Sequence, residues 1–139
     1  MDGGLPDVVR LPNKRSPSVI RFCRKVRLAR GNICENCGAK ASETQIESHH
    51  ILDYHTFSHL AKDEGNLLVL CQACHTGLSR PHGDLLGERL ICYGRLRPEL
   101  RERIAVYVEQ KAPHLTNFVS IVRAGEEAAK HYFFRRLET

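Results

Sequence analysis

The chain has 139 residues, of which 42% are hydrophobic and 27% charged, and its formal net charge is +5. These proportions are typical of a single globular domain and exclude a largely disordered chain. No apolar run approaches the roughly 20 residues that span a bilayer, and residues 1–16 lack the apolar region of a secretory signal. We therefore expect a cytoplasmic protein without a membrane partner, whose six cysteines bind metal rather than form disulfides.

The N-terminal part of the chain divides into a tail and a basic helix. Residues 1–17 contain a glycine pair and three prolines, which predicts a flexible tail. Between residues 18 and 30 apolar side chains recur at steps of three and four, which predicts a helix ending at Gly31. The other side of this helix is either an ordinary solvated face or a surface for nucleic-acid phosphates, and its basic residues are Arg21, Arg24, Lys25 and Arg27.

Short strands and turns are predicted for the middle of the chain. Residues 45–52 and 66–71 have the pattern of two strands, and the second is continuously apolar and therefore buried. A loop or short helix is expected over residues 55–62. A further brief helix is expected to begin near Gln72 and to end before Pro81, because proline cannot continue a helix.

Helices are predicted for the C-terminal third, after a small glycine-punctuated hairpin over residues 85–94. Residues 98–112 start with proline and carry an apolar stripe, which favours a helix. Residues 114–137 predict one or two further helices with Gly125 as the break. We accordingly divide the chain into a tail (1–17), a core with its N-terminal helix (18–97) and a helical segment packed on that core (98–139).

Four of the six cysteines form two C-x-x-C pairs, and these are Cys34, Cys37, Cys71 and Cys74. Each pair can place two thiolates at adjacent corners of a tetrahedron, so together they predict a structural Zn²⁺ site. A redox pair, a disulfide, and haem attachment at the C-x-x-C-H sequence that ends at His75 are the alternatives. The redox and haem readings leave one pair unexplained, and the disulfide and haem readings require export. Cys23 and Cys92 lie in apolar-periodic stretches and are expected in the core.

Six of the eight histidines lie between positions 49 and 82. We interpret three of them as surface residues, namely His55, His59 and His82. His49 and His50 are neighbours on a predicted strand, so they face opposite sides unless the backbone bends. A hydrolytic metal site needs few protein ligands and a nearby unligated histidine as base. His75 directly follows Cys74, so the cysteine site would hold it in place.

Two segments of the sequence, Glu47-Ser48-His49-His50-Ile51 and Gly65 to His75, resemble the HNH endonuclease family. The order His50, Asn66, His75 and its interleaving with two C-x-x-C pairs are similar to the family's pattern. The resemblance implies an α+β fold built on a small ββα-metal, treble-clef-like finger. Here that finger would be flanked by the N-terminal basic helix and the C-terminal helices.

The resemblance also implies roles for individual residues. His49 and His75 would hold a catalytic divalent ion, Mg²⁺ or Mn²⁺, although two imidazoles also accept Zn²⁺ or Ni²⁺. His50 would be the general base, and Asn66 would either help to hold the ion or fix the loop that orients the base. Many relatives carry a lysine shortly after the last histidine, where this chain offers only Arg80, which we expect to contact a phosphate.

The activity implied by the resemblance is metal-dependent hydrolysis of DNA phosphodiester bonds, by nicking or by double-strand cleavage. DNA would be bound mainly through its phosphates, by a monomer or a homodimer. The alternative function is that of a catalytically inactive, zinc-stabilised nucleic-acid-binding module. Mere binding does not require the simultaneous presence of His49, His50, Asn66 and His75, which therefore favours the enzyme.

Overall fold

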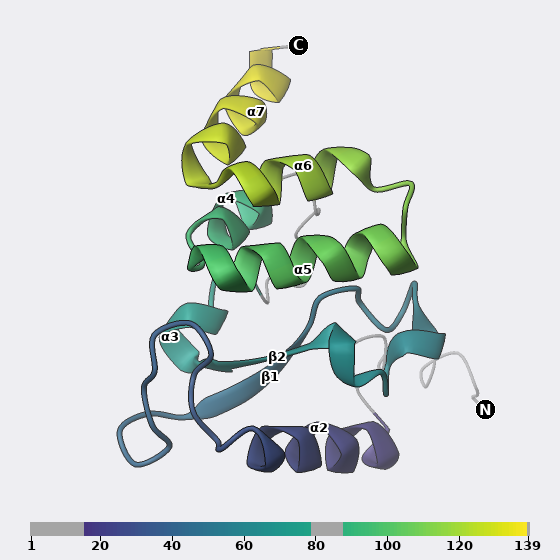
Figure 1. Ribbon diagram of the computed structural model, residues 1–139, viewed down its shortest axis with the longest axis vertical. Helices are drawn as coiled ribbons and strands as arrows, with labels where there is room; N and C mark the ends of the chain where they lie inside the picture. Colours follow the sequence, from purple (N-terminus) through teal and green to yellow (C-terminus); the bar gives the residue numbers. More distant parts are fainter. Residues whose placement is uncertain (1–15, 79–87, 139) are drawn as a thin grey trace, which may run out of the picture.

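Two antiparallel strands lie at the centre of the computed structural model, which describes residues 16–78 and 88–138 (Figure 1). Strand β1 spans Ile46–His50 and strand β2 spans Leu67–Cys71. They pair with Ile46 opposite Cys71 and His50 opposite Leu67. Every residue of β2 is buried, as its uninterrupted apolar run predicts. Both strands fall within the ranges expected from the sequence.

Helix α2 covers one side of this sheet and spans Pro17–Ala29 (Figure 1). The Ser16 hydroxyl accepts a hydrogen bond from the Val19 N–H and Pro17 occupies the first turn, which explains where the helix begins. Gly31 has a φ of 86°, a left-handed conformation suited to a residue just beyond a helix end. The buried face of α2 packs with Leu67 of β2 in a small core formed by Val19, Cys23 and Val26. The expected helix is therefore confirmed, whereas residues 1–15 of the expected tail lie outside the described residues.

The connection between the strands contains two short 3₁₀ helices, η1 (Ser58–Leu60) and η2 (Glu64–Asn66). Helix α3 (Gln72–His75) begins directly after β2, as expected. Two strands and a helix in this order make the ββα arrangement, and the fold class is α+β as predicted. The Cys71 and Cys74 thiols and the His75 ring are thus delivered by one strand end and the helix that follows it.

Helix α4 (Glu88–Gly94) replaces the hairpin expected over residues 85–94, and that prediction was wrong for residues 88–94. Residues 85–87 lie outside the described part of the chain. Leu90 and Tyr93, three residues apart, are both fully buried, and α4 contacts the two C-terminal helices. A Cβ at Gly94 would lie 2.7 Å from the Glu126 Cα. The glycine therefore permits a close approach between helices rather than a hairpin turn.

Helices α5 (Pro98–Lys111), α6 (Thr116–Ala124) and α7 (Glu126–Glu138) complete the described chain. Gly125, with a φ of 111°, separates α6 from α7, so the predicted break is confirmed. These helices lie on the side of the sheet opposite α2 (Figure 1). One hydrophobic core joins Leu68 and Leu70 of β2 to Ile104 and Phe118 of the helices. None of the helices in the described part of the chain is long and apolar enough to cross a bilayer.

Candidate metal centre and histidine site

The four cysteines of the C-x-x-C pairs converge on one point. Their sulfur atoms all lie within 4.8 Å of one another, and Cys37 Sγ is 3.7 Å from Cys71 Sγ. Two thiolates on a tetrahedral ion with Zn–S bonds of 2.3 Å would be about 3.8 Å apart. Gly38, with a φ of 81°, closes the turn after the second cysteine. The cluster is therefore positioned to bind a metal ion such as zinc.

The ionisation of these thiols also fits a cation site. Burial alone would raise the pKa of Cys34, but backbone N–H groups, Cys37's foremost, outweigh it and lower this pKa to about 7. Burial raises the pKa of Cys74 to about 12, and the neighbouring sulfur atoms add to that effect. Four adjacent thiolates repel one another, so a bound cation is needed for all four to lose their protons.

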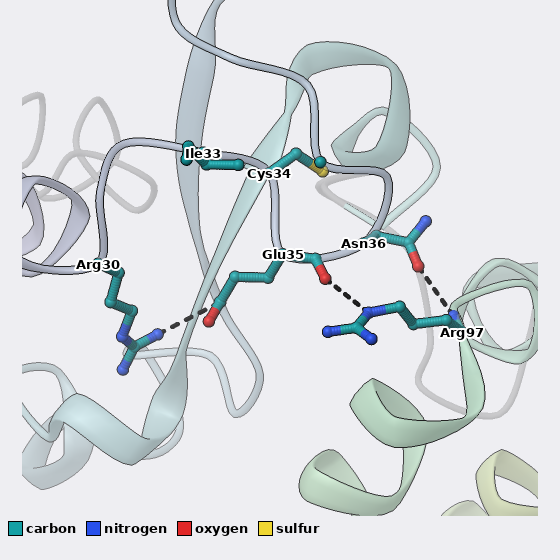
Figure 2. Close-up of a pocket in the computed structure, with 7 residues that line it drawn as sticks. Arg30, Ile33, Cys34, Glu35, Asn36 and Arg97 are labelled. Atoms are coloured by element: carbon teal, nitrogen blue, oxygen red, sulfur yellow. Dashed lines mark hydrogen bonds and ion pairs between the residues drawn. The ribbon is translucent and has the colours of Figure 1, made fainter.

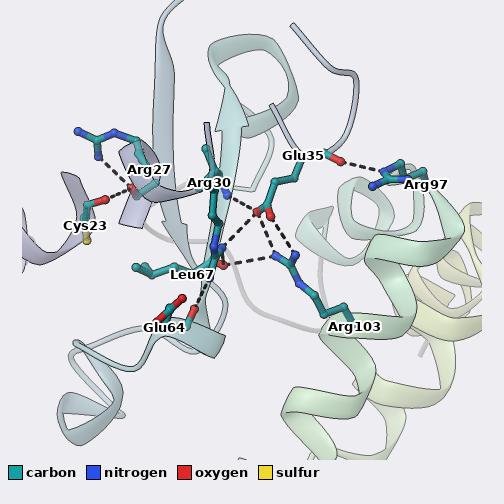
Figure 3. A network of polar contacts seen from close by, with 10 residues as sticks. Cys23, Arg27, Arg30, Glu35, Glu64, Leu67, Arg97 and Arg103 are labelled. Carbon is teal, nitrogen blue, oxygen red and sulfur yellow. Dashed lines mark hydrogen bonds and ion pairs between the residues drawn. The ribbon is translucent and has the colours of Figure 1, made fainter. Parts of the chain in front are cut away.

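Glu35, between the first two cysteines, fastens the cysteine turn to the rest of the fold (Figure 3). Its carboxylate accepts hydrogen bonds from the Val69 N–H at 2.7 Å and from Arg103 Nη1 and Nη2 at 2.9 and 3.0 Å. Arg30 Nη1 lies 3.3 Å from the same carboxylate. Burial would raise the pKa of Glu35, but these partners, Arg103 foremost, lower it below its usual value. The turn is thereby tied to β2, to the residue that follows α2 and to α5 at once.

A shallow surface cavity of about 430 Å³ lies beside this turn (Figure 2). At its edge, Arg97 Nε donates to the Glu35 carbonyl oxygen and the Arg97 N–H donates to Asn36 Oδ1, both at 2.8 Å. Asn36 Nδ2 in turn donates to Cys74 Sγ at 3.4 Å. The residue that precedes α5 thus helps to orient a cysteine of the metal site.

A second group of polar side chains gathers on the face of β1 that carries residues 47 and 49. His49 Nδ1 is 3.2 Å from His75 Nε2, and His75 Nδ1 is 2.6 Å from Glu47 Oε1. Glu47 and His49 share a face because strand side chains alternate. Strand β1 and helix α3 therefore bring together the two histidines that the sequence predicts as ion ligands.

The geometry of this pair fits two ligands of one ion. Ligand nitrogens 2.1 Å from an ion are about 3.0 Å apart in an octahedron and about 3.4 Å apart in a tetrahedron. The observed 3.2 Å lies between these values. Burial, with a smaller contribution from His75, lowers the pKa of His49 well below its usual value, so the ring is neutral as metal binding requires.

Glu47 completes the pair, and the sequence interpretation assigned it no role. A carboxylate can only accept, so it receives the His75 Nδ1 hydrogen and leaves the His75 lone pair on Nε2, facing His49. Metal-binding histidines commonly have such a carboxylate partner. The sequence could have indicated this role, because Glu47 and His49 are two positions apart on a strand and therefore lie on the same face.

His50 makes a different contact from its neighbour. Its Nε2 donates to the Ala61 carbonyl oxygen at 2.9 Å, and its ring lies 5.3 Å from the Tyr54 ring. Because the carbonyl can only accept, Nε2 carries the hydrogen, so the neutral form of the ring has its lone pair on Nδ1. His50 is therefore held in one tautomer by the loop between the strands.

Asn66 is fully buried and binds the same loop. Its Oδ1 accepts from the Leu52 N–H at 2.8 Å, and its Nδ2 donates to the carbonyls of Leu52 at 2.9 Å and Leu60 at 3.2 Å. Leu60 precedes Ala61, whose carbonyl holds His50. Of the two roles implied for Asn66, these contacts fit fixation of the loop that orients His50.

The basic residues predicted to contact nucleic acid differ in their exposure, and one of them lies outside the described residues. Arg21, Arg24 and Lys25 are exposed on α2. Arg27 is half-buried, and its Nη1 donates to the Ser48 hydroxyl at 2.9 Å, which ties α2 to β1 (Figure 3). Arg80 and His82 lie outside the described residues, whereas the other predicted surface histidines, His55 and His59, are exposed.

Together, the ββα arrangement, the cysteine cluster and the adjacent chain of one carboxylate and two histidines match the arrangement of a metal finger. The family model described as HNH endonuclease matches residues 34–80, so this segment is similar to that family. The match begins at the first cysteine of the cluster and includes both candidate ion ligands. Comparison with curated proteins and with solved structures found no match.

Proposed function

We propose that this protein is a metal-dependent endonuclease that hydrolyses DNA phosphodiester bonds. The observation that carries the proposal is the convergence of His49 Nδ1 and His75 Nε2 at 3.2 Å, with Glu47 behind His75. These atoms would hold a divalent ion while leaving its other positions open for substrate. The HNH match over residues 34–80 supports the same reaction class.

In this proposal each residue of the site has a distinct role in the reaction. His50, with its lone pair on Nδ1, takes a proton from the water that attacks the scissile phosphorus. Asn66 and the Ala61 carbonyl keep the His50 ring in place. When bound, Mg²⁺ or Mn²⁺ would supply positive charge against the phosphate and the departing 3′ oxygen. The products are DNA ends with a 5′-phosphate and a 3′-hydroxyl.

The cysteine cluster and the basic residues of α2 have supporting roles in this proposal. Zn²⁺ on the four cysteines would stabilise the finger that carries His75. Arg21, Arg24 and Lys25 on α2 would bind DNA phosphates, whereas Arg27 would mainly serve the contact between α2 and β1.

Cleavage of a supercoiled plasmid with added Mn²⁺ or Mg²⁺ tests the proposal. We expect the wild-type protein to nick or linearise the plasmid, and His50→Ala to lower the rate by about 10²- to 10⁴-fold. His59→Ala is the control, because it removes an exposed histidine. Zinc content and circular dichroism should be the same in all three proteins.

The possible results separate the two candidate functions. Undiminished cleavage by the His50→Ala protein would refute the role of this residue and expose a contaminating nuclease. A wild-type protein that retains zinc and binds DNA without cleaving it would instead be a zinc-stabilised nucleic-acid-binding module.

A further inference from the structure

A tyrosine from outside the HNH match contacts one of the candidate ion ligands. Tyr93 belongs to α4, and its hydroxyl lies 2.6 Å from His49 Nε2. Tyr93 is 0% exposed and His49 is 5% exposed, so this contact is sheltered from solvent. A buried tyrosine hydroxyl needs a hydrogen-bonding partner, and His49 is such a partner.

The position of the Tyr93 hydroxyl is determined by the helical layer. The Tyr93 ring packs edge-on against Phe118 of α6, with ring centroids 5.3 Å apart and an interplanar angle of 83°. Phe118 is itself fully buried. The next residue, Gly94, lies against the start of α7. Packing of α4 against α6 and α7 therefore leaves the hydroxyl little freedom relative to His49.

The contact decides which nitrogen of His49 faces His75. With Nε2 bonded to Tyr93, Nδ1 is directed at His75 Nε2. A hydroxyl can donate to Nε2 when Nδ1 carries the hydrogen, and it can accept from Nε2 when the Nδ1 lone pair binds a cation. Tyrosine therefore serves His49 both before and after an ion binds, which phenylalanine cannot do.

We propose that Tyr93 is a positioning residue that holds the His49 ring with Nδ1 directed at the ion site. The proposal rests on the proposed function, in which His49 is a ligand of the divalent ion. Helix α4, outside the matched segment, would then complete the site that the matched segment begins. Tyr93 acts through His49, in the way that outer partners orient metal-binding histidines.

The test compares Tyr93→Phe with wild-type protein whose cysteine site is loaded with zinc. Titration calorimetry with Mn²⁺ should show affinity about 10- to 100-fold weaker in the variant. Before Mn²⁺ is added, nitrogen-15 spectra should show a single Nδ1–H form of His49 in the wild type, whereas the His49 signals of the variant should be broadened or doubled because its ring is no longer fixed. Tyr107→Phe is the matched control, because its hydroxyl is bonded to Asp63 at 2.9 Å, and it should leave both measurements unchanged.

Wild-type Mn²⁺ affinity and an unchanged His49 spectrum in Tyr93→Phe would overturn the proposal. Failure of the proposed function has a different signature, since His49→Ala would then bind Mn²⁺ as tightly as the wild type does. If Tyr93→Phe does not fold, the wild-type protein still decides the matter. A slowly exchanging Tyr93 hydroxyl proton with a cross-peak to the His49 ring supports the contact, and its absence refutes it.

Discussion

The cysteine cluster and the histidine site share the segment from Cys71 to His75 but differ in how many ligands they supply. Four sulfur atoms within 4.8 Å can fill a tetrahedral shell, so the cysteine cluster is closed. The histidine site offers two facing nitrogens, which are too few to fill the shell of an ion by themselves. Closed shells are typical of structural metal sites and open shells of catalytic ones. One short strand–helix junction therefore contributes residues both to the cysteine cluster and to the proposed ion site.

The two sites also differ in what supports them. Arginines at or near the surface hold the cysteine turn, since half-buried Arg30 and exposed Arg103 pair with Glu35. A buried hydrogen bond holds His49, since the hydroxyl of the fully buried Tyr93 lies 2.6 Å from its Nε2. Charged pairs near the surface weaken with salt, whereas a buried hydrogen bond does so much less. We therefore expect substitutions at the cysteine cluster to change folding and zinc content, and substitutions at the histidine site to change Mn²⁺ affinity.

Loss of a cysteine ligand should have the largest effect. We expect Cys74→Ser to unfold the finger, because metal binding contributes on the order of 10 kcal/mol to the folding of small zinc domains. Circular dichroism and zinc content measure this effect. Cys92→Ser, at a half-buried cysteine outside the cluster, is the control. A folded Cys74→Ser protein would show that the helices hold the finger without the metal.

Removal of the carboxylate behind His75 should affect only the histidine site. Glu47→Gln should weaken Mn²⁺ binding by about 10- to 100-fold while zinc content and unfolding temperature stay near wild type. Glu43→Gln removes an exposed carboxylate nearby and should change neither quantity. Unaltered Mn²⁺ affinity in Glu47→Gln would argue against a supporting role for this carboxylate.

The smallest effect on stability is expected from Arg103→Gln, which removes the bidentate contact with the Glu35 carboxylate. Arg103 is 44% exposed, so the free energy of unfolding should fall by only about 1 kcal/mol. Arg24→Gln, on the exposed face of α2, should have no effect. Urea unfolding of the zinc-loaded proteins measures the difference.

The difference in free energy of unfolding between the wild type and Arg103→Gln should depend on pH in a way that follows from the lowered pKa of Glu35. A carboxylate whose pKa is lower in the folded state stabilises the fold above its unfolded pKa and loses this contribution as the pH falls through its folded pKa. The difference between wild type and Arg103→Gln should therefore be the same at pH 7 and pH 5.5. A difference already absent at pH 5.5 would assign the effect to another group.

Much of the fold could be predicted because its signals are local. The apolar stripe of α2, the uninterrupted apolar run of β2 and the proline that begins α5 each lie within one element. The hairpin prediction failed for α4 because a short helix buried by distant helices has little periodicity of its own. Tertiary contacts with α6 and α7 outweighed the glycine signals there.

The amino-acid sequence by itself determined which residue types could bind metal, since C-x-x-C spacing and the His49, Asn66 and His75 pattern are properties of the chain. Only the tertiary structure decided which side chains support them. Glu35 meets an arginine 68 positions away, and His49 meets a tyrosine 44 positions away. Such partners are chosen by the packing of helices against the sheet, and no local pattern encodes that packing.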